Sequence, residues 1–150
     1  MIKTKFNLKK VAAIVACLVM TTTFSSCEEE IIIIEEPYMV LGDYGLMVMR
    51  EDLGKSTWSG ARDMCKQTRV GGFSDWRLPT KEELAILYNA RNIIGGFETF
   101  NNTQYWSSTP HDFKGSFYMC LNFTNGYFGD YPDASNHQPL AVRCVRNVYP

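Results

Sequence analysis

One stretch of this 150-residue chain, from Gly71 to Tyr88 (GGFSDWRLPTKEELAILY), restricts its fold more than any other. The glycine pair that opens it permits a tight turn, because glycine adopts positive φ without strain. Pro79 favours an extended conformation for the residue before it. Thr80 and Glu83 then have the spacing of a capping box, in which each side chain accepts the backbone N–H of the other residue. The stretch predicts a turn, a short extended segment and a helix.

The residues around this capping box predict how the helix packs. Leucine and tyrosine side chains fall on one helical face: Leu84, Leu87 and Tyr88. Trp76 and Leu78 precede the helix and are expected to pack against its base. Asp75 and Arg77 flank the tryptophan, and we interpret them as a structural ion pair or as ligands of the loop backbone.

The rest of the chain predicts a second helix and several short strands. Ser56 or Thr57 is expected to cap a helix that runs to about Thr68, with Trp58, Ala61 and Cys65 on one face. Strands are predicted at residues 38–41, 45–49, 104–109, 116–123 and 140–148. Asn125 and Gly126 predict a primed hairpin turn. Tyr127 and Phe128 are expected to start the return strand, followed by a polar loop over residues 129–139.

The N-terminal region has the organisation of an exported lipoprotein. Residues 1–26 combine four lysines, a short apolar run and small residues, which is typical of a signal peptide. Cys27 follows at the position of a lipid-modified cysteine. The alternative is an ordinary cleaved signal followed by a chance cysteine. We expect residues 27–37 to form an acidic tether and residues 38–150 to form the folded domain, with the lipid holding the protein in the outer membrane.

Charge in the predicted domain argues against polyanionic partners. From Pro37 onward, acidic and basic residues occur in equal numbers, and the sequence shows no basic face. Nucleic acid is therefore not an expected partner, and neither is a polyanionic sugar.

Five motifs in this order are similar to the C-terminal domain of the collagen-like adhesin Lcl: DLGKSTWSGARDMC, GGFSDWRLPTKEELAILY, YWSST, FTNG and VRCVR. The resemblance extends from about Gly42 to Asn147. It implies an α+β, C-type-lectin-like fold, with two helices packed on small antiparallel sheets and the chain ends close together. The founding member binds sulfated polysaccharides, but the balanced charge of this domain does not support the same ligand here. The acidic residues after Cys27 resemble the surface-export signal of Bacteroidetes lipoproteins, which implies an anchor facing the cell exterior.

Three cysteines remain in the predicted domain, and they allow three pairings: Cys65, Cys120 and Cys144. The resemblance implies a disulfide between Cys65 and Cys144, because a bridge from the first helix to the last strand recurs in lectin-like folds. Cys120 would then be a buried free thiol within a strand. The alternative is that all three are buried and reduced.

Catalytic and metal chemistry have little support in the sequence. Cys120 with His111 or His137 is the only pattern for a Cys-His hydrolase, and a cysteine inside an apolar strand is more often a core residue. The two histidines lie far apart without a CxxC motif, so no zinc site is expected. Asp130 and Asp133 would suit calcium, but a solvated polar loop is the simpler reading. We expect no enzymatic activity, no metal and no cofactor.

The polar loop carries the residues that we predict to bind a ligand. Tyr127 and Tyr131 are expected to be exposed beside amides and carboxylates, which suits recognition of a glycan or a protein. The candidate binding residues are Tyr127, Asp130, Tyr131, Asp133, Asn136 and His137. The predicted function is a surface-anchored, non-enzymatic binding or adhesion domain. The alternative is a structural or accessory subunit of a cell-surface assembly, in which residues 31–34 (IIII) pair with a neighbour's sheet edge.

Overall fold

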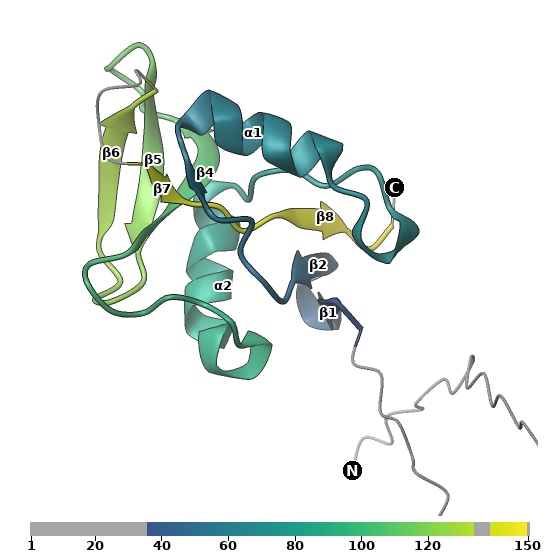
Figure 1. Cartoon of the computed structure of the whole chain (residues 1–150). Helices are drawn as coiled ribbons and strands as arrows, with labels where there is room; N and C mark the ends of the chain where they lie inside the picture. The colour runs from purple at the N-terminus through teal and green to yellow at the C-terminus, as the bar shows by residue number, and fades with distance from the viewer. Residues whose placement is uncertain (1–35, 134–138, 150) are drawn as a thin grey trace, which may run out of the picture. The chain divides into compact units, whose positions relative to one another are not determined.

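The computed structural model describes residues 36–133 and 139–149 (Figure 1). The predicted signal peptide, Cys27, most of the tether, Asn136 and His137 lie outside these residues. In the described part of the chain, no helix has the length and apolar character needed to cross a membrane.

The first sheet joins the beginning and the end of the described domain. It contains β1 (Tyr38–Leu41), β2 (Leu46–Met49) and β8 (Val145–Asn147) in the order β1-β2-β8, with every pair antiparallel. A short 3-10 turn, η1 (Gly42–Tyr44), connects β1 to β2, and Gly45 closes it at φ 59°. The predicted N-terminal hairpin is thus confirmed. Because β1 and β8 both pair with β2, the two ends of the domain lie close together.

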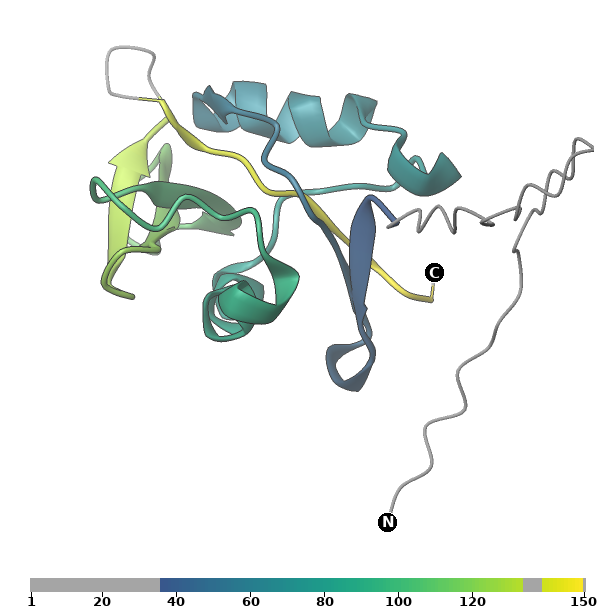
Figure 2. The same cartoon turned by 60° about the horizontal axis from the view of Figure 1, so that its bottom comes forward.

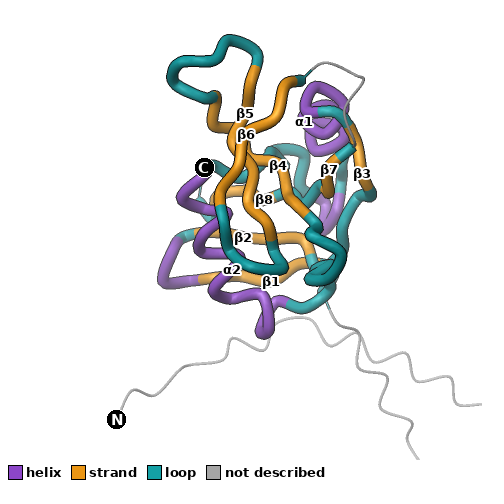
Figure 3. The backbone as a smooth tube through the Cα atoms, turned by 90° about the vertical axis from the view of Figure 1, so that its left-hand side faces the viewer, coloured by secondary structure: helices purple, strands orange, loops and turns teal. Residues whose placement is uncertain are grey.

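The second sheet has the order β3-β7-β4-β5-β6 (Figure 3). Its strands are β3 (Lys55–Ser56), β4 (Gln104–Pro110), β5 (Phe117–Asn122), β6 (Phe128–Pro132) and β7 (Leu140–Ala141). All pairs are antiparallel except β4 with β7, which is parallel. The predicted strands at 104–109 and 116–123 are confirmed with small changes at their ends.

Two predictions for the C-terminal third are wrong. Residues 140–148 do not form one strand, because β7 and β8 belong to different sheets. Between them, Val142 exchanges backbone hydrogen bonds with Leu53 and Gly54, so the chain leaves one sheet before it joins the other. Residues 129–132 are not part of a loop but lie in β6, where they pair with β5.

The turn between β5 and β6 also differs from the predicted primed hairpin. Gly126 has a φ of 79°, but Asn125 does not have the positive φ that this turn type requires. Instead, the Asn122 side chain accepts hydrogen bonds from the backbone N–H groups of Thr124 and Asn125. The carbonyl of Asn122 accepts a further bond from the Gly126 N–H, at 2.8 Å. The result is a wider connection than a two-residue turn.

Both predicted helices are present with the predicted caps. Helix α1 (Trp58–Gln67) begins after Thr57, whose hydroxyl accepts the Gly60 N–H at 3.3 Å. Helix α2 (Lys81–Ile94) begins after Thr80. Its capping box is complete: the Thr80 hydroxyl accepts the Glu83 N–H at 3.2 Å, and the Glu83 carboxylate accepts the Thr80 N–H at 2.8 Å.

Helices α1 and α2 lie on opposite sides of the strands (Figure 2). In that view, the yellow C-terminal segment runs between the two helices. Alternate residues of β2 make this arrangement possible, because successive side chains of a strand point to opposite faces. Met47 and Met49 enter the core cluster beside α1, whereas Leu46 and Val48 enter the cluster beside α2. The confirmed fold class is α+β, with two helices and two small sheets.

Candidate functional site

The Gly71–Tyr88 stretch is hydrogen-bonded to β8, the last strand of the domain. The backbone of Arg77 exchanges two hydrogen bonds with Val145, each 2.9 Å long. The Arg77 guanidinium also donates to both carboxylate oxygens of Glu83, at 2.7 and 2.8 Å, and to the Asn147 side chain at 2.7 Å. Burial by itself raises the pKa of the Glu83 carboxyl, but the bonds from Arg77 and Thr80 bring this pKa below its ordinary value.

Asp75 and Arg77 do not pair with each other, so the interpretation of them as one ion pair is wrong. Asp75 instead accepts a hydrogen bond from Arg146 at 2.7 Å, and the Arg146 guanidinium lies over the Phe73 ring. Asp75 therefore pairs with a residue that is distant in sequence, and Arg77 pairs with a residue of the following helix. These contacts hold the turn before α2 against β8 and the start of α2.

A second arginine connects three loops inside the domain. The side chain of Arg143 is fully buried and donates to Asp52 at 2.5 Å. It also donates to the carbonyls of Met49 and Gly96, and it stacks on the Phe97 ring at 3.9 Å. These contacts fix the path of the chain after α2, which leads directly to β4.

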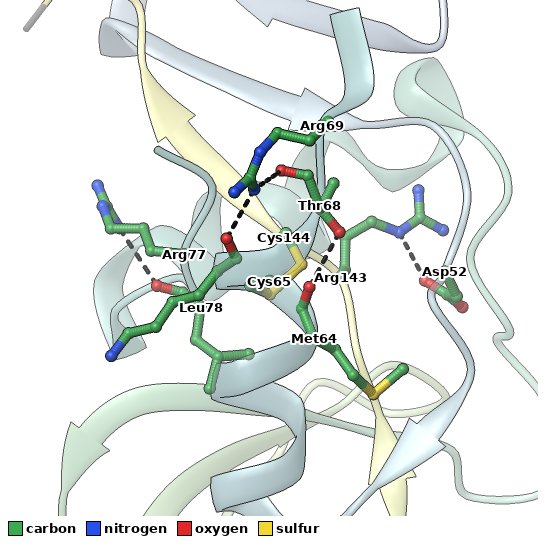
Figure 4. Close-up of a disulfide and its surroundings, with 10 residues drawn as sticks. Asp52, Met64, Cys65, Thr68, Arg69, Arg77, Leu78, Arg143 and Cys144 are labelled. Carbon is green, nitrogen blue, oxygen red and sulfur yellow. Dashed lines mark hydrogen bonds and ion pairs between the residues drawn. A yellow bond between two sulfur atoms is a disulfide. The ribbon is translucent and has the colours of Figure 1, made fainter. Parts of the chain in front are cut away.

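The Cys65–Cys144 disulfide lies beside this arginine (Figure 4). It joins α1 to the segment between β7 and β8, with a Cα–Cα distance of 5.7 Å. Both cysteines are fully buried. The pairing implied by the family resemblance is therefore confirmed.

A pocket of about 280 Å³ opens where the second sheet meets the chain that follows α2. Its lining comes from β3, β4, β6, β7 and the turn before β4: Lys55, Asn101, Asn102, Thr103, Gln104, Tyr131, Pro139, Leu140 and Ala141. Three of these residues carry amide side chains, and one carries an aromatic ring with a hydroxyl. The lining is therefore mostly polar, with a smaller apolar part from Pro139, Leu140 and Ala141.

Contacts beneath the pocket hold Gln104 in one orientation. Its amide nitrogen donates to the Tyr131 hydroxyl at 3.2 Å, and its amide oxygen accepts from the Cys120 thiol, also at 3.2 Å. Tyr131 packs edge-on against Trp106. Asn101 and Asn102 both have positive φ, at 54° and 55°, in the turn that leads into β4. The pocket is thus a preformed arrangement of amides around one tyrosine.

The sequence matches the Lcl C-terminal domain family over residues 38–146. This chain belongs to that family. The match covers nearly all of the described domain and confirms the resemblance carried by the five sequence motifs. No curated protein matches the chain.

In this Lcl C-terminal domain, the four predicted binding residues that the structure describes do not form one site. Tyr127 is 75% exposed on the β5–β6 turn, as predicted, whereas Tyr131 is half-buried and belongs to the pocket. Asp130 forms an ion pair with Lys114 at 2.7 Å. Asp133 accepts the Ser59 N–H at the start of α1, at 2.8 Å. Both carboxylates therefore have protein partners, and neither lines the pocket.

Cys120 is a buried free thiol, as predicted. Burial raises the pKa of this thiol to about 12, so it is protonated at neutral pH. Across residues 36–133 and 139–149, no group of three or more His, Cys, Asp or Glu is placed to hold a metal ion.

The sequence interpretation missed the three amide residues of the pocket. Asn101 and Asn102 lie outside the predicted helices and strands, and Gln104 begins a predicted strand. Paired asparagines before a strand are a usable signal for positive φ, because asparagine tolerates this conformation better than most residues. Their proximity to Tyr131 is set by strand pairing and has no local signature in the sequence.

Proposed function

We propose that this Lcl C-terminal domain is a non-enzymatic binding module with a C-type-lectin-like fold, exposed on the cell surface by a lipid on Cys27. Two helices against two small sheets support this fold. The pairing of the first and last strands with β2, which keeps the domain ends together, supports it as well. The ligand would be a glycan or a protein.

The observation that carries the binding function is the pocket lined by Asn101, Asn102, Gln104 and Tyr131. Amide groups supply donors and acceptors, and the tyrosine adds an amphipathic surface, so the pocket can orient a polar ligand. Nucleophilic chemistry has no comparable support. The only free thiol among the described residues, Cys120, is protonated, buried and hydrogen-bonded to Gln104.

A binding screen tests this function. The full chain, purified with its disulfide formed in a detergent that lacks a sugar headgroup, would be applied to a glycan array and to immobilised surface proteins. We expect saturable binding that is lost when Asn101 and Asn102 are both replaced by glycine. Retention of all binding by this double variant would contradict the proposal that the pocket is the binding site.

The alternative, a subunit of a cell-surface assembly, is favoured by one surface. Val40, Tyr44 and Ile93 are exposed around a groove of about 410 Å³ between β1 and α2. A blank binding screen from folded protein, together with a stable assembly that dissociates on Ile93→Lys substitution, would favour this alternative over the binding module.

The proposed lipid on Cys27 can be tested separately in cells. Cells that express the full chain and are fed an alkyne-labelled fatty acid should incorporate the label into the protein. The Cys27→Ser variant should carry no label, because the modified sulfur is missing. External protease should degrade the wild-type protein on intact cells if the anchor faces outward. An unlabelled wild-type chain would exclude the lipoprotein assignment.

A further inference from the structure

We infer that the pocket between β4, β6 and β7 takes a single uncharged sugar residue, and that it does so without calcium. This inference rests on the proposed binding function and adds the chemical class of the ligand. Four features of the described residues carry it: the charge of the lining, its unpaired amides, the size of the space and the contacts of the nearby carboxylates.

The lining offers no free charge to a ligand. Lys55 is its only charged residue, and its ammonium group lies 3.0 Å from the Glu98 carboxylate. An anionic ligand would meet a lysine that is already paired. A cationic ligand would meet no carboxylate in the lining. Because the lining supplies no unpaired charge to hold an ionic group, the pocket favours an uncharged ligand.

The amides offer paired donors and acceptors at the pocket mouth. Each asparagine side chain carries one acceptor oxygen and two N–H donors. The side chains of Asn101 and Asn102 are exposed and make no hydrogen bond to another described residue. A sugar hydroxyl both donates and accepts, so neighbouring hydroxyls on one ring match this set. Gln104, held by Cys120 and Tyr131, adds a third amide in a fixed orientation.

The size and the apolar part of the pocket suit one ring. The pocket volume of about 280 Å³ lies just below the range for small-molecule sites, about 300–1,000 Å³. The lining also includes the apolar residues Pro139, Leu140 and Ala141 and the ring of Tyr131. A pyranose ring presents C–H groups on its faces and hydroxyls at its edge, which matches a lining that combines apolar residues with amides.

Calcium has no ligand set in this pocket. Calcium sites are built from several oxygen ligands, usually including carboxylates. Asp130 is held by Lys114, and Asp133 is held by the start of α1. Sugar binding through Asn101, Asn102 and Gln104 therefore needs no metal ion, and a chelator should leave it unchanged.

The test compares uncharged and charged sugars on the full chain. Saturation-transfer NMR and calorimetry would measure binding of methyl glycosides of glucose, galactose, mannose and N-acetylglucosamine, each with and without EDTA. Methyl glucuronoside serves as the charged counterpart. We expect at least one neutral glycoside to bind, the glucuronoside to bind at least about tenfold more weakly, and EDTA to have no effect.

The informative variant is Asn101→Gly with Asn102→Gly. Glycine adopts positive φ freely, so the change removes both amides without straining the turn. Affinity should fall by about tenfold or more, since each lost hydrogen bond contributes a factor of several. Ser116→Gly is the matched control, because it removes a polar side chain at another position of positive φ, φ 63°, outside the pocket lining. This control should bind like the wild type.

Three results would overturn the inference. They are tighter binding of the glucuronoside, loss of binding in EDTA, and no binding of any neutral glycoside. If the wild type then binds a protein or a charged glycan that the Asn101→Gly/Asn102→Gly variant does not bind, the proposed binding function stands and only the ligand class is wrong. If the pocket variant loses no binding of any kind, the proposed function fails as well.

Discussion

Replacement of Asp52 by asparagine should lower the free energy of unfolding by about 3–5 kcal/mol, the cost typical of breaking a buried ion pair by removing one partner. The reason is that Arg143 is fully buried and would lose its only carboxylate. The Tyr105 hydroxyl, which donates to the other oxygen of Asp52 at 2.6 Å, would lose an ionic acceptor as well. Chemical denaturation followed by tryptophan fluorescence measures the change.

Two further variants separate the buried pair from a general effect of charge. Asp63→Asn is the matched control, because Asp63 pairs with Arg62 on the surface and such pairs contribute little. It should leave the denaturation midpoint nearly unchanged. The double variant Asp52→Leu/Arg143→Met removes both charges and should be more stable than Asp52→Asn. A loss in Asp52→Asn no larger than that in Asp63→Asn would contradict this account of Arg143.

Loss of the Cys65–Cys144 disulfide should cost about 2–5 kcal/mol of stability. The bridge spans 79 positions of sequence, for which the chain-entropy model gives about 4.5 kcal/mol. It also holds α1 against the segment that carries Arg143 (Figure 4), so the loss should weaken packing on both sides of the strands. The Cys65→Ala/Cys144→Ala variant, compared with the wild type by urea denaturation, measures the effect.

A reductant provides the control for this second prediction. Under dithiothreitol, the wild type should fall toward the stability of the double variant, whereas the double variant should not change. The Cys120→Ala variant lacks the free buried thiol but keeps the disulfide. The reductant should therefore lower its stability as it lowers that of the wild type. Unchanged stability of the reduced wild type would show that the bridge contributes little to the folded state.

Local sequence determined the elements whose causes lie within a few residues. The capping box of Thr80 and Glu83 was predicted from four consecutive residues and is complete in the structure. Thr57, one of two predicted caps, begins α1. The strands at 38–41 and 116–123 follow from alternation and turn signals, which also act over short distances. The five motifs together indicate the family to which the chain belongs.

Only the tertiary structure decided which distant groups meet. Asp75 pairs with Arg146, not with nearby Arg77, because the register of β8 brings the end of the chain alongside the turn before α2. The break between β7 and β8 depends on hydrogen bonds from Val142 to a loop about ninety positions earlier. Neither contact has a local signal in the sequence, because the fold of both segments decides which groups meet.

The candidate site shows the same division. The sequence predicted an exposed Tyr131 in a loop with Asp130 and Asp133, whereas this tyrosine is half-buried and lies in β6. Strand pairing turns Tyr131 toward Gln104, whereas the two carboxylates turn to Lys114 and to the start of α1. Sequence alone therefore determined the helices, four of the eight strands in the described residues (β1, β2, β4 and β5) and the family. The contents of the pocket were decided by the tertiary structure, because β4, β6 and β7 contribute to it from distant parts of the chain.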